Sequence, residues 1–194
     1  MEKLTFRFAD QIWSLGEKPI LMGILNVTPD SFSDGDAYLD TDAACRHARQ
    51  MIEQGASLID VGGESTRPGA KAVDTAKELE RVIPVIRKIT AVTSTPISID
   101  TRKAEVGRAA LDAGADILND VSGLEDPEMR LLAAERDVPV VVMHSIETPV
   151  DPDTEIDYDD VVEDVIDDLT ERVLLAEKAG LDREQIVVDP GLGF

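Results

Sequence analysis

Short apolar runs alternate along this chain with amphipathic segments of helical period. The apolar runs are rich in Val, Ile and Leu, as is typical of strands covered on both faces, and they lie at 21–27, 58–62, 96–101, 117–121, 139–144 and 186–189. The segments between them predict helices at 41–54, 74–92, 104–113, 127–136 and 158–179. Because strand and helix alternate, we expect a parallel sheet with right-handed crossovers.

The helical periods also predict which side chains lie on the apolar face of each long helix. In the first helix these are Ala43, Ala44, His47, Ala48 and Met51. In the second they are Leu79, Val82, Ile83 and Ile86, and in the last they are Val161, Val162, Val165, Ile166, Leu169, Val173 and Leu174.

Two α/β architectures fit a repeating strand–helix order, the (β/α)8 barrel and the open doubly wound sheet. The dinucleotide-binding form of the second needs a G-x-G-x-x-G turn after the first strand, and the segment 28–35, TPDSFSDG, lacks it. We therefore expect a TIM-type (β/α)8 barrel in which residues 1–194 form one domain. A complete barrel has about 250 residues, so about six β/α units are expected here and the C-terminal units are expected to be missing.

The stretch LIDVGGESTRPG, at 58–69, converts a strand into a polar loop within a few residues. Gly62 and Gly63 allow close approach of the backbone to another group, and a Pro-Gly pair ends the segment in a turn. In a parallel sheet, ligands bind at the carboxyl ends of strands, which is where these polar residues lie. A surface connection that merely carries charges is the alternative for any one of them.

Polar or polarisable residues end the other predicted strands as well. They are Asn26, Asp100, Asn119, Met143 with His144, and Asp189, in addition to Glu64–Arg67. In a barrel these positions meet at one rim. Each has a structural alternative when taken alone: Asp100 could cap the next helix, Asn119 could bond loop backbone, and Asp189 could form a turn before Pro190.

The chemistry of these side chains suggests what such a rim would bind. Carboxylates and carboxamides on an apolar background suit the edge of a flat heterocycle with adjacent N–H groups, such as a 2-amino-4-oxopyrimidine in a guanine-like or pterin-like ring. Arg67, in a loop bounded by Gly and Pro, suits a phosphate, pyrophosphate or carboxylate through its forked donors.

Charge and cysteine content narrow the class of protein. A net charge of -21 argues against nucleic acid and anionic membrane as partners, and it suggests a protein kept soluble in high salt. Cys45 is the single cysteine, so we expect a reducing cytoplasm rather than a disulfide framework. The first 20 residues show no signal peptide, and the sequence has no apolar run of 18 residues. The two histidines are too few and too far apart for a histidine-built zinc site.

Six motifs now resemble those of the dihydropteroate synthase family, in the same order. They are GILNVTPDSFSDG at 23–35, IDVGGESTRPGA at 59–70, SIDT at 98–101, ND at 119–120, VMH at 142–144 and DPGLGF at 189–194. The resemblance implies a pterin-binding barrel in the cytoplasm that condenses 6-hydroxymethyl-7,8-dihydropterin diphosphate with p-aminobenzoate. The products would be pyrophosphate and dihydropteroate for folate synthesis. Small-molecule substrates and a possible homodimer would be its partners.

The resemblance also implies roles for the pterin-contacting residues. Asp100, Asn119 and Asp189 would hold the edge of the pterin, while Met143 and Phe194 would pack near its ring. Asn26 would coordinate a Mg²⁺ ion that also binds the diphosphate, as a hard cation with oxygen ligands does.

The two loops would receive the second substrate. Phe32 and Pro68 would form an apolar slot for the p-aminobenzoate ring, and Thr66 with Arg67 would order the second loop around the anion. Asp34 would lie near the developing positive charge. The resemblance thus gives the catalytic roles to Asp34, Arg67 and Asp100.

This sequence departs from the family pattern in two places. Family members commonly continue past the final phenylalanine into a Gly-Lys pair and later Lys and Arg/His motifs, and the stretch SIETP at 145–149 replaces a Met-Gln-Gly type. We expect a polypeptide ending at Phe194 to have little synthase activity and to expose unpaired strand edges. A pterin-binding methyltransferase barrel and a non-catalytic piece of a longer or fused enzyme remain as alternatives.

Overall fold

The computed structural model describes residues 5–8, 11–16, 18–28, 37–65, 72–146 and 158–192. Its centre is a six-stranded sheet in which every neighbouring pair is parallel and strand order equals chain order. The strands are β3 (Met22–Asn26), β4 (Leu58–Gly62), β5 (Ile97–Asp100), β6 (Ile117–Asp120), β7 (Val140–Met143) and β8 (Ile186–Asp189).

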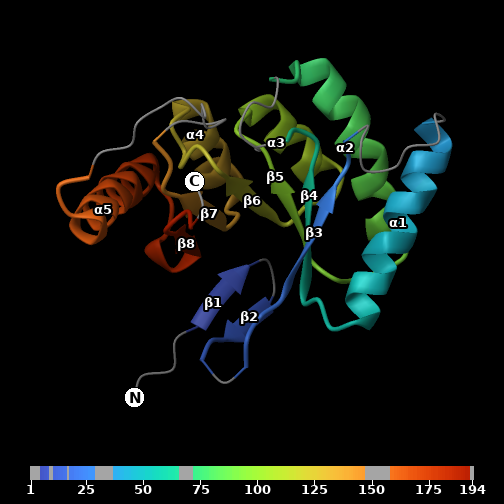
Figure 1. The fold of residues 1–194 in the computed structure, drawn as a ribbon, viewed down its shortest axis with the longest axis horizontal. Helices are drawn as coiled ribbons and strands as arrows, with labels where there is room; N and C mark the ends of the chain where they lie inside the picture. Colours follow the sequence, from blue (N-terminus) through green and yellow to red (C-terminus); the bar gives the residue numbers. More distant parts are fainter. Residues whose placement is uncertain are drawn as a thin grey trace.

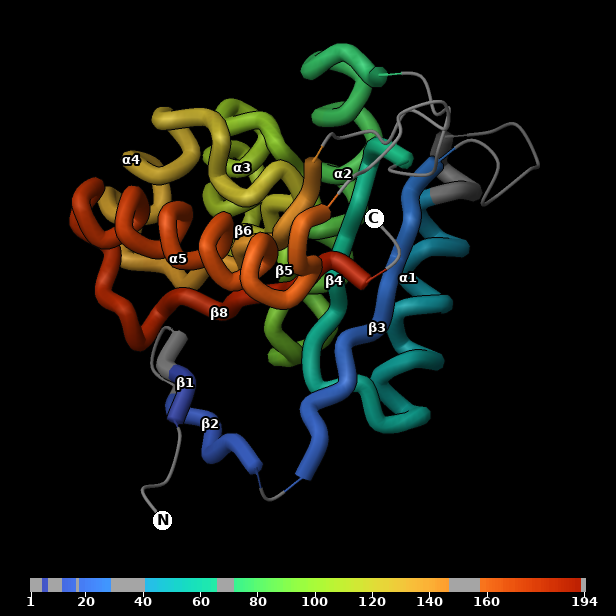
Figure 2. The backbone as a smooth tube through the Cα atoms, turned by 60° about the vertical axis from the view of Figure 1, so that its left-hand side comes forward, coloured from blue at the N-terminus to red at the C-terminus, as the bar shows by residue number. Residues whose placement is uncertain are grey.

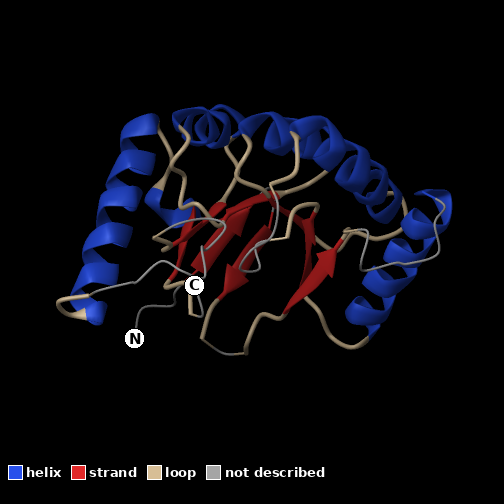
Figure 3. Cartoon of the chain, turned by 45° about the horizontal axis from the view of Figure 1, so that its top comes forward, coloured by secondary structure: helices blue, strands red, loops and turns tan. Residues whose placement is uncertain are grey.

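The helices form one layer outside this sheet (Figures 1 and 3). They are α1 (Ala37–Glu53), α2 (Thr75–Thr90), α3 (Ala104–Asp112), α4 (Pro127–Arg136) and α5 (Val161–Ala179), followed by a short 3-10 turn, η1 (Arg183–Gln185). A doubly wound sheet would reverse its strand order and carry helices on both faces. The predicted barrel-type winding, with six strands present, is therefore confirmed.

The predicted elements are all found, with shifts at their ends. Helix α1 begins at Ala37, four residues before its predicted start, and α5 begins at Val161. A hairpin of β1 (Thr5–Phe8) and β2 (Gln11–Ser14) was not predicted. It lies beyond the amino ends of the parallel strands, where β1 contacts η1 (Figure 2).

Alternation along the strands separates an apolar face from a polar one. The residues turned toward the helices are buried and form the main core together with the helices' inner side chains; they include Leu25, Ile59, Val61, Ile97, Ile99, Leu118, Val140 and Val142. The alternate positions therefore face the inside of the curved sheet, and they are the ones that carry Asn26, Asp60, Asp100, Asn119, Met143 and Asp189.

Two predicted helix faces are wrong in part. On α1 the predicted Ala44 and Ala48 are buried, but His47 is exposed and Cys45, which was not predicted on this face, is buried. Helix α2 runs through Pro84 and buries Glu78, Val82, Val85, Ile86 and Ile89, which is a face rotated from the predicted one. Glu78 can occupy this buried face because Lys103 pairs with one of its carboxylate oxygens and the Thr101 hydroxyl donates to the other.

Helix α5 buries Leu169 and Ala176 but exposes Val161, Val162, Ile166 and Leu174 by about half. A groove of about 280 Å³ lies between α5 and Val188 of β8. Strands β3 and β8 are the two edges of the sheet, and neither pairs with a further strand of the described chain, as expected. None of the described helices combines the length and apolar character needed to cross a membrane.

Candidate functional site

The carboxyl ends of the strands bring the predicted polar residues to one face of the sheet. Gly62 on β4 pairs with Asn26 on β3 and with Asp100 on β5, and Asp100 pairs in turn with Asn119 on β6. Farther along the sheet, Met143 on β7 pairs with Asp189 on β8. The predicted residues of these strands are thus brought together on the inner face.

The Asp100 carboxyl lies over Gly62, where an added Cβ atom would force the carboxyl to shift by a few tenths of an ångström. A Cβ atom at Gly62 would lie 3.1 Å from Asp100 Oδ2. Burial raises the pKa of Asp100 well above its usual value, and the charges of Asp60, Asp120, Glu78 and Glu64 raise it further. Helix α3 has Lys103 at its N-cap without a side-chain cap bond, so the capping alternative for Asp100 is wrong.

Asp60 is a buried carboxyl on the same inner face, two residues before Gly62, and the sequence reading did not single it out. The Asn119 side-chain amide donates to it, with Nδ2 3.1 Å from Asp60 Oδ2. Burial raises the pKa of Asp60, although the neighbouring Ser98 hydroxyl and the Asn119 amide each lower it. The sequence offered one signal for Asp60, which is the single acid in an otherwise apolar strand. It lies two residues before Gly62, so both residues face the same side of the sheet.

Asp120 follows Asn119 but points to the opposite face, toward the helices. Its Oδ1 accepts hydrogen bonds from the Ser122 backbone N–H at 2.8 Å and from the Ser122 hydroxyl at 2.6 Å. Burial raises the pKa of Asp120 despite these bonds. The two residues of the ND motif therefore have different roles. Asn119 faces the inside of the sheet, whereas Asp120 bonds the segment after β6.

Asp189 is half-buried at the end of β8 and takes part in a local turn. Its Oδ1 accepts from the Gly191 N–H at 2.9 Å, and its backbone oxygen accepts from the His144 N–H at 2.9 Å. The turn expected as its alternative is thus present. The same turn fixes the direction of the carboxyl group at the rim.

His144 links the ends of β7 and β8 to α5. Its Nδ1 lies 2.6 Å from Asp168 Oδ2, and its Nε2 lies 3.0 Å from the Tyr158 hydroxyl. Arg172 Nε donates to the same Asp168 oxygen at 2.7 Å, while the rest of its guanidinium donates to the backbone oxygens of Ser122 and Ser145. A polar network therefore joins the segment after β7 to α5.

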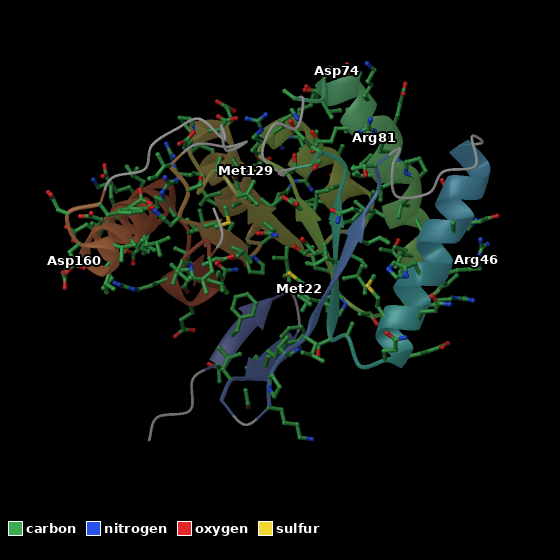
Figure 4. All side chains as sticks on the ribbon, viewed as in Figure 1. Met22, Arg46, Asp74, Arg81, Met129 and Asp160 are labelled. Atoms are coloured by element: carbon green, nitrogen blue, oxygen red, sulfur yellow. The ribbon has the colours of Figure 1, made fainter. Side chains whose placement is uncertain are left out.

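A second network closes the base of the loop that follows β4. Glu64 Oε1 accepts from the Val73 N–H at 3.1 Å, which joins the described residues on the two sides of the loop. Arg102 and Lys103 lie 3.0 Å and 2.5 Å from the two Glu64 oxygens. Arg81 of α2, labelled in Figure 4, donates to the Gly63 carbonyl at 2.7 Å. Although Glu64 is partly desolvated, which raises its pKa, these bonds outweigh burial and lower it.

Several predicted site residues lie outside the described part of the chain. They are Phe32, Asp34, Thr66, Arg67, Pro68 and Phe194. Asn26 is described, and its side chain is exposed at the end of β3. Within the described ranges, no group of three or more His, Cys, Asp or Glu side chains is arranged to hold a metal ion.

The described part of the site is a wall of hydrogen-bond acceptors at the carboxyl ends of the strands. Asp100, Asn119 and Asp189 present carboxyl and amide oxygens from three strands, with buried Met143 beside them. Such a wall can hold a flat ring by its N–H groups and pack against its face.

Comparison with known proteins gives a consistent result. Residues 22–194 match a family described as pterin binding enzyme. The chain is 64% identical over 185 residues to a Haloferax volcanii protein named probable bifunctional folylpolyglutamate synthase/dihydropteroate synthase, covering 95% of this chain and 22% of that protein. It is 50% identical over 182 residues to the dihydropteroate synthase of Bacillus subtilis, covering 93% of this chain and 61% of that enzyme.

A solved structure agrees with these sequence relatives. The dihydropteroate synthase of Xanthomonas albilineans with 4-aminobenzoic acid superimposes with a TM-score of 0.89 at 47% identity, covering 100% of this chain and 68% of that one. The chain thus spans between about a fifth and two thirds of the length of the proteins it matches.

Proposed function

This chain belongs to the pterin binding enzyme family, and we propose that it carries the pterin-holding part of a dihydropteroate synthase. The reaction joins the amine of p-aminobenzoate to the methylene carbon of 6-hydroxymethyl-7,8-dihydropterin diphosphate. The new C–N bond replaces the C–O bond to the diphosphate, which leaves as pyrophosphate, and the amine gives up a proton. Synthase names among the relatives favour this activity over a pterin-dependent methyltransferase.

The observation that carries the proposal is the acceptor wall formed by Asp100, Asn119 and Asp189. The 2-amino-4-oxo edge of a pterin has adjacent N–H donors, and each finds a carboxyl or amide oxygen on this wall. Asp100, whose pKa is raised in the folded protein, becomes a better acceptor when a ligand N–H or a cation approaches it. Met143 gives the ring an apolar surface to pack against.

The loops after β3 and β4 are proposed to bind p-aminobenzoate. Phe32 and Pro68 would flank its ring, Thr66 and Arg67 would hold the anion, and Asp34 would stabilise the developing positive charge. The Glu64 network supports this assignment, because it fixes both sides of the second loop at its base. A loop held at its base can close over the substrates and exclude water from the electrophilic carbon.

Mg²⁺ is proposed as the cofactor, with Asn26 as its protein ligand. Mg²⁺ usually keeps several waters and takes one or two protein oxygens together with substrate phosphates. An exposed carboxamide at the end of β3 fits this pattern. The ion would supply charge neutralisation to the departing diphosphate, while Asp100, Asn119 and Asp189 would hold the pterin in position.

We propose the cytoplasm as its compartment, which the single buried cysteine supports. The homodimer expected from the resemblance stays a prediction. The similarity to a Haloferax protein and the net charge of -21 together support a salt-rich interior.

The test is calorimetry on the protein in its natural full length, with 6-hydroxymethyl-dihydropterin diphosphate and Mg²⁺. Asp100→Ala and Asp189→Ala should each weaken binding by roughly 10- to 150-fold, as expected for the loss of a hydrogen bond to a charged group. Glu80→Ala removes the same charge from the exposed side of α2 and serves as the control. Equal affinities for all four proteins, or no dihydropteroate formed from the two substrates, would contradict the proposal.

A further inference from the structure

We propose that Asp60 is a positioning residue of this pocket, which orients the Asn119 amide so that the pocket selects a 2-aminopteridine over its 2-oxo analogue. The inference rests on the proposed pterin function and extends it to a residue that does not itself touch the ligand. Three features of the described structure carry it: depth, hydrogen-bond direction and the surroundings of Asp60.

Asp60 lies one step deeper in the curved sheet than the acceptor wall. Its register partners are Ile24 and Ser98. The next inward-facing pair on β4 and β5 joins Gly62 to Asp100. The side chain is buried, while Asp100 and Asn119 are each partly accessible. Asp60 therefore lies beneath the wall, where it can act on the wall but not on a bound ring.

The hydrogen bond from Asn119 to Asp60 determines which end of the amide faces the pocket. A carboxamide has an NH₂ donor on one side and a carbonyl acceptor on the other, and an ionised carboxylate only accepts. With Nδ2 bonded to Asp60 Oδ2 at 3.1 Å, the Asn119 carbonyl oxygen is left for the ligand. The opposite orientation would place two acceptors, the Asn119 carbonyl oxygen and the Asp60 carboxylate oxygen, against each other and would leave the buried carboxylate oxygen without a donor.

The charge state of the two neighbouring carboxyls agrees with this direction. Burial raises the pKa of both carboxyls. The negative charge of Asp60 raises the pKa of Asp100 further. Hydrogen bonds from Ser98 and Asn119 counteract the rise in the pKa of Asp60. The hydrogen bond from the Asn119 amide thus favours the ionised form of Asp60, which is the form that accepts from Asn119.

The orientation of the Asn119 amide determines which pteridine the pocket binds more tightly. A 2-aminopteridine offers an N–H donor where its 2-oxo analogue, a lumazine, offers a carbonyl. The Asn119 carbonyl oxygen accepts from the first and repels the second. Sites built to hydrogen-bond a group reject analogues that lack it because their buried polar groups are then left unpaired.

Asp60→Asn tests this with almost no change in shape. The substituted side chain can present either its carbonyl or its NH₂ to Asn119, so the direction of the Asn119 amide is no longer fixed. The matched control is Asp120→Asn. Asp120, on β6, is a buried carboxyl with a raised pKa like Asp60, but it faces the helices rather than the pocket. Calorimetry on the natural full-length protein would compare 6-hydroxymethylpterin with 6-hydroxymethyllumazine as probes.

We expect Asp60→Asn to lower the ratio of pterin to lumazine affinity at least about tenfold, with Asp120→Asn leaving the ratio unchanged. In turnover, Asp60→Asn should raise KM for the pterin substrate more than it lowers kcat, because amine attack does not involve Asp60. If Asp60→Asn does not fold, Asp60→Ser provides the same test, because it also removes the negative charge and has a smaller side chain.

Two results would overturn the inference in distinguishable ways. Tight pterin binding by the unsubstituted protein, with the same ratio in Asp60→Asn or an equal change in Asp120→Asn, would overturn the role of Asp60 alone. Absence of pterin binding by the unsubstituted protein would overturn the proposed function and the inference together.

Discussion

The ammonium nitrogen of Lys103 lies 2.5 Å from a carboxylate oxygen of Glu78, whose side chain is fully buried in α2. The other Glu78 oxygen accepts from the Thr101 hydroxyl at 2.7 Å. Since Lys103 also lies 2.5 Å from Glu64, one cation joins α2, the loop after β4 and the start of α3. The geometry makes Lys103 the counter-charge that allows an acid to be buried beside the site.

Lys103→Met should therefore destabilise the protein by about 3–5 kcal/mol, because it leaves the buried Glu78 charge without its partner. Urea unfolding measures the change. Lys77→Met is the control, since Lys77 pairs with Asp74 on the surface and such pairs contribute at most about 1 kcal/mol. Adding Glu78→Leu to Lys103→Met should recover part of the loss. Similar losses for Lys103→Met and Lys77→Met would contradict the assignment.

The raised pKa of Asp100 predicts a pH dependence of stability. In the unfolded chain Asp100 titrates near 3.8, so between that value and its raised folded pKa the folded protein holds a proton that the unfolded chain has lost. Its contribution to stability is then present at low pH and is lost as pH rises through the folded pKa.

Asp100→Asn removes this titration. We expect the variant to be more stable than the parent at pH 8, by on the order of 1 kcal/mol or more, with the difference shrinking toward pH 4. The same change should weaken pterin binding, so stability and affinity move in opposite directions. Glu105→Gln, on the exposed side of α3, should show neither effect. A stability difference that grows as pH falls would refute the sign.

Gly191→Ala should disrupt the turn that directs Asp189. Gly191 has a φ of +68°, and a Cβ atom there would lie 2.1 Å from the His144 carbonyl oxygen. That oxygen belongs to backbone and cannot move aside easily, so we expect a loss of about 2 kcal/mol in stability together with weaker pterin binding. Thermal unfolding and calorimetry measure the two effects. Gly55→Ala, also at positive φ but with open space around the added atom, separates backbone strain from the clash.

The acid excess predicts stabilisation by salt. With 40 acidic and 19 basic residues, like-charge repulsion opposes the compact state until mobile ions screen it. We expect the melting temperature to rise by several degrees between about 0.1 M and about 2 M KCl. A melting temperature that stays level or falls would rule out adaptation to high salt as the reason for the composition.

The sequence made the sheet predictable because each strand is an apolar run with a polar end. Period two places Asp100 and Asn119 on the face opposite their apolar neighbours, and parallel order carries both to the same rim. Asp60 was missed because a single acid in a buried strand is a weak local signal, and its partner Asn119 lies 59 residues away in the sequence. Its position in phase with Gly62 was the only clue available.

The remaining differences have the same physical origin. Glu78 belongs to the buried face of α2 only because Lys103 reaches it from 25 residues away. The hairpin of β1 and β2 was missed because its strands pair with each other and lie outside the repeating strand–helix order of the main sheet. Local pattern predicts elements well, whereas these features depend on contacts that the pattern does not contain.

Strand order equal to chain order also has a consequence for how the pocket forms during synthesis. Asp60, Asp100 and Asn119 come from three consecutive strands, so a growing polypeptide contains all three, with the helices that cover them, before Asp189 is translated. The acceptor wall can therefore assemble on the ribosome from β5 onward, above Asp60 of β4. A pause in translation after β7 would leave a nascent intermediate that already contains Asp60, Asp100 and Asn119 but not Asp189.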